Sequence, residues 1–107
     1  MVVNQFEVWL VNLEPTIGSE IKKTRPALIV SPNEMNSNLN TVIIAPLTTS
    51  EKHYPKRVPI IFQKKKGFIV LDQIRTVDKL RLVAKLGTID KKTQKYTLNI
   101  LIEMFSL

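Results

Sequence analysis

The chain has 107 residues, 44% hydrophobic and 23% charged, which is the size and balance of one globular domain spanning residues 1–107. It has no cysteine and one histidine, His53, which excludes disulfides, thiolate zinc sites and histidine pairs within the chain. No apolar run approaches the roughly 18 residues of a membrane span, and no signal-peptide pattern follows Met1. We therefore expect a cytoplasmic protein without membrane contact. The net charge of +7 favours a polyanionic partner, most simply nucleic acid.

Short strands are predicted for the first three quarters of the chain, because apolar and β-branched residues gather there in brief runs between turn residues. The predicted strands are residues 6–13, 26–30, 41–45, 57–62, 68–71 and 80–86. Pro46 is expected to end the third strand or to place it at a sheet edge. Residues 33–40 are predicted to be a loop with at most one helical turn, and residues 64–67 a turn.

The last segment is predicted to be a helix, since Leu98, Leu101, Ile102 and Phe105 recur at helical spacing. Asp90, one turn upstream, is suited to cap its first turn. We expect this stripe to pack on the chain's own barrel, with a dimer contact as the alternative. Several short strands and one C-terminal helix predict a mainly β fold, a small and strongly bent β-barrel.

The loop before residue 26 is the first candidate for chemistry. Residues 18–26 place an acid, three bases and two hydroxyls between two strands, and functional residues favour loops held by rigid strands. Pro26 keeps Arg25 extended, and a guanidinium can give a phosphate two parallel hydrogen bonds. The alternative is a surface arginine in a solvated loop, which the residues by themselves favour slightly.

Hydroxyls follow the third predicted strand, at Thr48, Thr49 and Ser50. Such groups can donate to phosphate oxygens, although more often they satisfy the backbone of a turn. His53 lies a few residues further on and could act as a general acid or stack on a base, although a lone loop histidine usually does neither.

Alternating charges and amides run from residue 71 to residue 81. Asp72 and Gln73 could read base edges, and Arg75 or Arg81 could hold backbone phosphates. The structural alternative is that Asp72 pairs with Arg75 or caps a turn. Residues 64–66 are three lysines, which we interpret as a solvated hairpin tip.

The groups available for catalysis suit RNA. The chain has no phosphate-binding glycine loop, and its glutamates are dispersed instead of clustered as in a two-metal nuclease. RNA supplies its own nucleophile, the 2′-OH, so one arginine, one hydroxyl and one carboxylate can meet the remaining demands without a metal. The residue types alone are compatible with this chemistry, but they do not favour it over other functions.

Three ordered blocks, residues 7–31, 42–50 and 72–87, strongly resemble the PemK/MazF family of toxin endoribonucleases. The resemblance implies an SH3-like barrel of the CcdB/MazF type that forms a homodimer. It also implies sequence-specific, ribosome-independent cleavage of single-stranded RNA without a metal or other cofactor. It covers nearly the whole chain in the right order.

The family's site residues can be carried over position by position. Arg25 matches the arginine and Thr48 the threonine at the scissile phosphate, and Glu20 matches the first-loop acid, a candidate base or RNA-binding group. The residues expected to bind RNA line a groove and are Ile17, Ser19, Thr49, Asp72, Gln73 and Arg75. Among them, Asp72 matches a position that is implicated in cleavage by some members of the family.

Two departures from the family pattern matter. Some members carry histidine where Ser19 stands, and some carry a second catalytic arginine where Val70 stands. The chain therefore resembles the subgroup that relies on Arg25 and Thr48, and the identity of the proton acceptor stays open.

The resemblance further implies a cognate antitoxin with an acidic C-terminal tail, which the positive charge of the chain suits. DNA is then a partner only indirectly, through the toxin–antitoxin complex. Two other functions stay open from the sequence: a non-catalytic nucleic-acid-binding barrel, and a gyrase-targeting toxin of the CcdB type. Toxins of the latter type typically act through their C-terminal residues, and here residues 104–107 are apolar enough to be buried.

Overall fold

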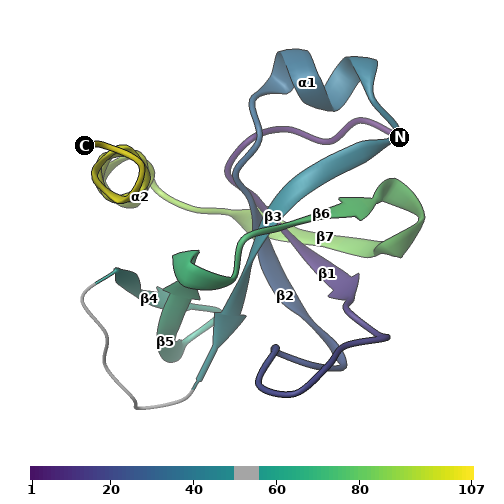
Figure 1. Cartoon of the computed structure of the whole chain (residues 1–107), viewed down its shortest axis with the longest axis horizontal. Helices are drawn as coiled ribbons and strands as arrows, with labels where there is room; N and C mark the ends of the chain where they lie inside the picture. Colours follow the sequence, from purple (N-terminus) through teal and green to yellow (C-terminus); the bar gives the residue numbers. More distant parts are fainter. Residues whose placement is uncertain (50–55) are drawn as a thin grey trace.

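Antiparallel strands form one strongly bent sheet in the computed structural model, which describes residues 1–49 and 56–107 (Figure 1). The strands run in the spatial order β4-β5-β3-β2-β1-β7, and β6 pairs with the remaining part of β3. Their bounds are β1 Glu7–Asn12, β2 Thr24–Ile29, β3 Thr41–Thr48, β4 Arg57–Phe62, β5 Lys65–Val70, β6 Arg75–Asp78 and β7 Leu82–Thr88. The helical elements are α1 Asn33–Asn38, the 3₁₀ turns η1 Leu71–Gln73 and η2 Lys79–Arg81, and α2 Lys91–Met104. A mainly β fold with a C-terminal helix, as predicted, is confirmed.

Strand β3 lies in the middle of the sheet and does not end at Pro46, so that prediction is wrong. One edge of β3 pairs with β2. The other edge pairs with β6 up to Ile44 and with β5 from Leu47 onward. Pro46 falls where the partner changes, so its missing N–H leaves the two ladders intact.

The hairpin between β4 and β5 turns earlier than predicted. Phe62 pairs directly with Lys65, so the turn consists of Gln63 and Lys64, both with positive φ (50° and 66°). Two consecutive residues in this conformation form the type of turn that suits the twist of a hairpin. Sequence reasoning missed it because such turns usually contain asparagine or glycine.

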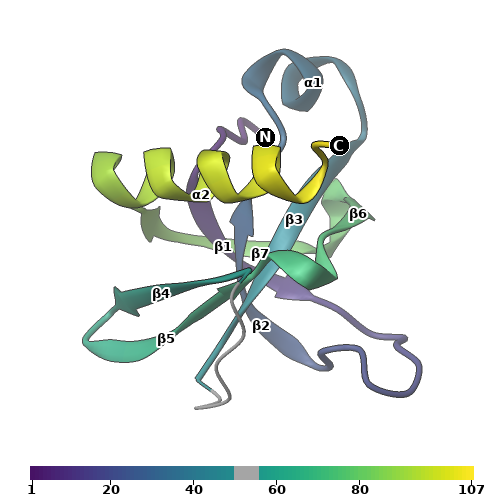
Figure 2. The same cartoon turned by 60° about the vertical axis from the view of Figure 1, so that its left-hand side comes forward.

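Helix α2 covers one side of the sheet (Figure 2), but not with the stripe predicted from its periodicity. Thr97 and Ile100 are buried, and Leu101 packs beside them on the core beneath the helix. Ile102 and Phe105 are 65% and 71% exposed, so most of the predicted stripe faces outward. Asp90 caps the helix as predicted, accepting a hydrogen bond from the Thr93 N–H (2.8 Å).

Two hydrophobic cores lie on the two faces of the bent sheet. The first packs Trp9 against residues of β1, β2 and β3, so the predicted core role of Trp9 is confirmed. The second lies under α2 and includes Val8, Leu28 and Ile69. No helix within residues 1–49 and 56–107 is long and apolar enough to cross a membrane.

Glu7 is a carboxylate held inside the fold. It is 4% exposed and accepts hydrogen bonds from the Trp9 indole N–H (3.1 Å) and the Asn4 backbone N–H (2.8 Å). Lys85 of β7 forms an ion pair with it at 2.8 Å. Burial alone raises the pKa of Glu7, but the hydrogen bonds from Asn4, Lys85 and Trp9 together outweigh burial and lower that pKa below its ordinary value.

Candidate active site

Arg25 and Thr48 lie on neighbouring strands. The β2–β3 ladder ends where Ala27 is opposite Pro46; Arg25 and Thr48 each lie two residues beyond this pair and line the same pocket. On the other side of β3, Thr48 is opposite Phe68 of β5. Arg25, Thr48 and Phe68 therefore form a row across the ends of β2, β3 and β5, and all three line one pocket.

This row opens into a small pocket of about 170 Å³, here called the hairpin pocket, between the ends of β2 and β3 and the β4–β5 hairpin. Its lining mixes cationic and apolar side chains and comprises Arg25, Pro26, Leu47, Thr48, Thr49, Ile60, Phe62, Gln63, Lys65, Lys66, Gly67 and Phe68. A shallower groove of about 510 Å³ continues from it past Pro59 and Ile61. A phosphate would meet positive charge here, and a base would meet apolar surface.

The guanidinium of Arg25 is partly held by its own loop. Its Nε–H donates to the carbonyl of Lys22 at 2.8 Å. The two terminal nitrogens have no hydrogen-bond acceptor among residues 1–49 and 56–107. The arrangement orients the guanidinium while leaving its forked end available, which is the geometry that binds a phosphate by two bonds.

A second pocket of about 420 Å³, the loop pocket, lies between η1 and the first loop (residues 13–23), which joins β1 to β2. It is lined by Ser19, Glu20, Ile21, Pro46, Asp72, Gln73, Ile74 and Arg75. Pro46 forms part of its wall and lies two residues from Thr48 on the same face of β3. The two pockets therefore adjoin at the end of β3.

Polar side chains of the loop pocket are oriented by specific partners. Glu20 is exposed, and its Oε1 accepts a hydrogen bond from the Ile17 N–H (2.6 Å). The Gln73 carbonyl oxygen accepts from the Ile21 N–H (2.8 Å), so its amide NH₂ group faces elsewhere as a donor. Glu20 and Gln73 thus keep hydrogen-bonding capacity for a ligand.

Asp72 pairs with Arg57 of β4 and not with Arg75, so the predicted pairing is wrong. Arg57 Nε and Nη2 lie 3.0 and 3.2 Å from the two carboxylate oxygens. Arg75 instead donates to the carbonyl of Leu13 (3.2 Å). No pattern in the sequence pointed to Arg57, because the partners are 15 residues apart and meet only when β4 pairs with β5.

Gly67 is a further residue of the site that the sequence did not mark. A Cβ built on it would lie 2.3 Å from the carbonyl oxygen of Thr48, closer than any real side chain is found. Only glycine lets β5 approach the end of β3 this closely. Gly67 therefore sets where Thr48 lies.

The fold divides the predicted site residues between the two adjoining pockets. Arg25, Thr48 and Thr49 line the hairpin pocket, and the loop pocket contains Ser19, Glu20, Asp72, Gln73 and Arg75. Ile17 projects from the first loop, 83% exposed, and lines neither pocket. Ser50 and His53 lie outside the described residues. Within the described part of the chain, no three His, Cys, Asp or Glu side chains gather as a metal site.

Residues 4–105 match the protein family described as the PemK-like, MazF-like toxin of type II toxin–antitoxin systems. The chain belongs to this family. Among its PemK/MazF relatives, the endoribonuclease toxin MazF of Escherichia coli K12 is 32% identical over 99 residues, 89% of this chain and 88% of that protein. The endoribonuclease EndoA of Bacillus subtilis 168 is 35% identical over 97 residues, 84% of this chain and 83% of that protein.

Solved structures of the family share the fold. MazF from Deinococcus radiodurans matches 100% of this chain and 99% of its own with a TM-score of 0.87 and 23% identity. The MazE–MazF complex of the same organism matches 100% of this chain and 98% of its own with a TM-score of 0.80 and 20% identity. The predicted barrel of the CcdB/MazF type is thereby confirmed.

Proposed function

We propose that this chain, an endoribonuclease toxin of the PemK/MazF family, cleaves single-stranded RNA at a recurring short sequence by attack of a 2′-OH on the adjacent phosphate. The observation that carries the proposal is the row formed by Arg25 and Thr48 on adjacent strands. A forked cation and a hydroxyl thus lie beside a pocket that contains the exposed carboxylates of Glu20 and Asp72 and the half-buried amide of Gln73. These groups suit a reaction whose nucleophile belongs to the substrate.

The bond changes define what the side chains must do. The 2′-oxygen bonds to phosphorus as its proton passes to a base, and the bond from phosphorus to the 5′-oxygen breaks as that oxygen gains a proton. The products of this step are a 2′,3′-cyclic phosphate and a 5′-hydroxyl. Arg25 neutralises the charge that develops on the phosphorane and takes part in proton transfer, and Thr48 holds the phosphate. Glu20 is the candidate base.

RNA is proposed to run across both pockets. Ser19, Asp72, Gln73 and Arg75 offer donors and acceptors to base edges and phosphates in the loop pocket, and Thr49 does so at the hairpin pocket. Ile17, which is exposed on the first loop, is proposed to contact a base. The apolar walls of the hairpin pocket supply surface on which bases can pack.

The proposed assembly is a homodimer neutralised by a cognate antitoxin with an acidic tail. The exposed apolar side chains at the end of α2, Ile102 and the C-cap residue Phe105, support a protein contact on that face. An acidic peptide would bind the same cationic groove as RNA because it presents similar charge. The MazE–MazF complex of Deinococcus radiodurans, which shares the fold, supports this partner class.

Incubation of the purified protein with a long single-stranded RNA in excess EDTA tests the proposal, with Arg25→Ala alongside. We expect fragments that begin after one recurring sequence, and a rate at least about 100-fold lower in the variant because a charged transition-state donor is gone. Circular dichroism and gel filtration check that the variant keeps its fold and assembly. Cleavage that needs a divalent metal, or that persists in Arg25→Ala, would refute the mechanism.

A folded protein that cuts no RNA would instead favour the non-catalytic binding barrel or the gyrase-targeting toxin. An assay of gyrase supercoiling then separates these two functions.

A further inference from the structure

The first loop is held at its base by two arginines, Arg75 of β6 and Arg81 of η2. Arg81 of η2 donates from Nη1 to the carbonyl of Asn12 (3.2 Å) and to that of Glu14. Arg75 donates to the carbonyl of Leu13 between them (3.2 Å). Guanidinium groups therefore donate to three successive carbonyls where β1 ends.

Hydrogen bonds continue from this base to Arg25. The Glu14 carboxylate accepts from the Lys23 N–H (2.9 Å), and the Lys23 carbonyl accepts from the Leu13 N–H (3.0 Å), which closes the loop on itself. Lys23 has a φ of 70°, a conformation that a residue other than glycine adopts only when its surroundings hold it there. Its neighbour Lys22 supplies the carbonyl that orients the Arg25 guanidinium.

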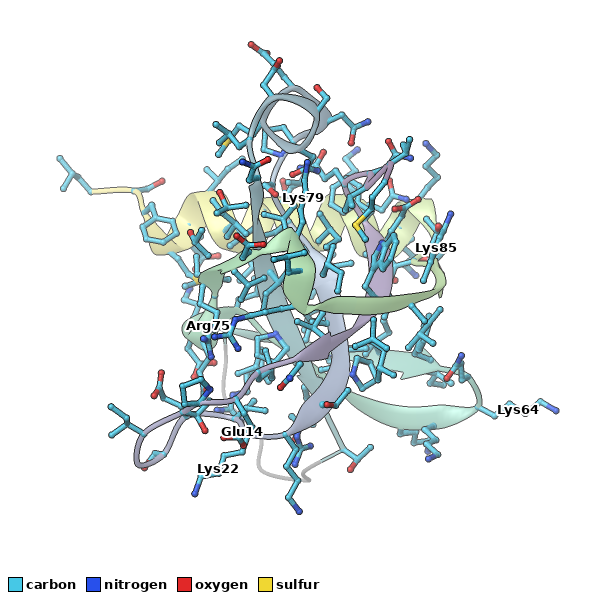
Figure 3. All side chains as sticks on the ribbon, turned by 90° about the vertical axis from the view of Figure 1, so that its right-hand side faces the viewer. Glu14, Lys22, Lys64, Arg75, Lys79 and Lys85 are labelled. Atoms are coloured by element: carbon cyan, nitrogen blue, oxygen red, sulfur yellow. The ribbon has the colours of Figure 1, made fainter. Side chains whose placement is uncertain are left out.

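These contacts form one relay across the loop, from Arg81 through Glu14 and the Lys22–Lys23 peptide to Arg25. Figure 3 shows Glu14 and Lys22 side by side on the loop, with Arg75 just above them. The sequence offered Arg81 as a phosphate-binding residue. In the structure, one nitrogen of the Arg81 guanidinium instead donates hydrogen bonds to carbonyls of the first loop.

We propose that Arg81 is a positioning residue, which sets the orientation of Arg25 by clamping the base of the first loop. Its effect on catalysis rests on the proposed function, whereas its effect on the loop does not. The role favours arginine, since both carbonyls accept from one planar nitrogen, Nη1, whose two N–H bonds point in fixed directions, while a lysine ammonium is a flexible point donor.

The experiment compares Arg81→Met, which removes the clamp, with Arg81→Lys, which keeps the charge. Glu14→Ala breaks the same relay at an exposed residue and covers the case in which Arg81→Met does not fold. Lys91→Met is the matched control, because it also removes one positive charge but lies in the first turn of α2, away from the loop (Figure 2). Each protein is measured by amide hydrogen exchange, steady-state cleavage kinetics and the salt dependence of RNA binding.

For Arg81→Met we expect the Lys23 amide to exchange roughly tenfold faster, because its acceptor on Glu14 is no longer held. The value of kcat should fall by about 10- to 100-fold through misplacement of Arg25. KM should change much less, and Arg81→Lys should recover part of the loss. Glu14→Ala should act in the same direction, and the double variant should lose less than the product of the two single effects.

The salt dependence separates positioning from direct RNA contact. If Arg81 bound a phosphate directly, its replacement would reduce the log–log slope for single-stranded RNA by about 0.7. The proposal requires the slope of Arg81→Met to equal that of Lys91→Met. A reduced salt slope together with unchanged hydrogen exchange at Lys23 would mean that Arg81 binds RNA, and it would overturn the proposal. The proposal would also be overturned if Arg81→Met exchanged faster at Lys23 but kept the kcat of the unaltered protein.

Failure of the proposed function gives a different result. If the unaltered protein cuts no RNA, the exchange measurement alone decides the clamp: faster exchange at Lys23 supports it, and unchanged exchange rejects it.

Discussion

Glu7 of β1 and Glu20 of the first loop are both carboxylates, but their surroundings differ in every respect. Glu7 is buried and engaged by an indole N–H, a backbone N–H and a lysine. Glu20 is exposed and accepts one short-range hydrogen bond from its own loop. A buried polar group without partners is costly, so burial commits a carboxylate to the fold, whereas exposure leaves it available to a ligand.

The same division separates two regions of the molecule. Around β1 and β7, polar groups bind one another and contribute to stability. Around the two pockets, Glu20, Gln73 and Arg25 are oriented by backbone groups and keep spare hydrogen-bonding capacity. Substitutions in the first region should therefore change stability more than activity, and substitutions in the second should do the reverse.

Glu7→Ala tests the first half of that comparison and has the largest expected effect on stability. It leaves the Trp9 indole N–H without its buried acceptor and removes the partner of Lys85, which should lower the free energy of unfolding by roughly 3 kcal/mol. Urea denaturation measures the loss. Glu34→Ala, which removes an exposed carboxylate on α1, should change stability by less than about 0.5 kcal/mol.

Lowering the pH provides a second test of how Glu7 contributes to stability. Because folding lowers its pKa, the ionised form stabilises the fold above the ordinary carboxyl pKa of about 4.3. This contribution is lost as the pH falls through the lower pKa of the folded state. The stability difference between the unaltered protein and Glu7→Ala should accordingly narrow below about pH 4. A constant difference would mean that ionisation of Glu7 contributes nothing.

Gly67→Ala should be an exception to the comparison, because Gly67 lines the hairpin pocket and yet its substitution should lower both stability and activity. A methyl group there meets the Thr48 carbonyl, so β5 must move away from the end of β3. We expect a loss of about 2 kcal/mol in stability and a clear fall in kcat of the folded protein. Gly87→Ala is the control, since its Cβ would meet only the Phe62 ring at 3.4 Å. Equal effects of the two substitutions would show that the site does not depend on Gly67.

Thr48→Val has the smallest expected effect and sharpens the second half of the comparison. Valine keeps the shape of the side chain and removes its hydroxyl, so cleavage should slow by about tenfold through loss of a phosphate donor. Thr88→Val, at the exposed end of β7, should leave the rate unchanged. An unaffected cleavage rate in Thr48→Val would mean that the Thr48 hydroxyl has no role in catalysis and that Thr48 is only a structural residue at the end of β3.

Local pattern predicted most of the strands, the cap at Asp90 and the core position of Trp9, because burial and capping leave a direct signature in residue type. The order of residue types around Arg25 and Thr48 also indicated the family. It did not indicate β6, where only Val77 is buried, nor the two-residue turn at Gln63 and Lys64.

Residue order alone established which groups the protein has available: a strong positive charge, one arginine before a proline, and hydroxyls after a buried strand. How these groups are held depends on the folded chain. Folding paired Asp72 with Arg57, placed Gly67 against Thr48, turned Ile102 and Phe105 outward, and set Arg81 on the first loop. Each of these contacts joins residues distant in the chain or depends on which face of an element is covered. Local propensity contains neither kind of information.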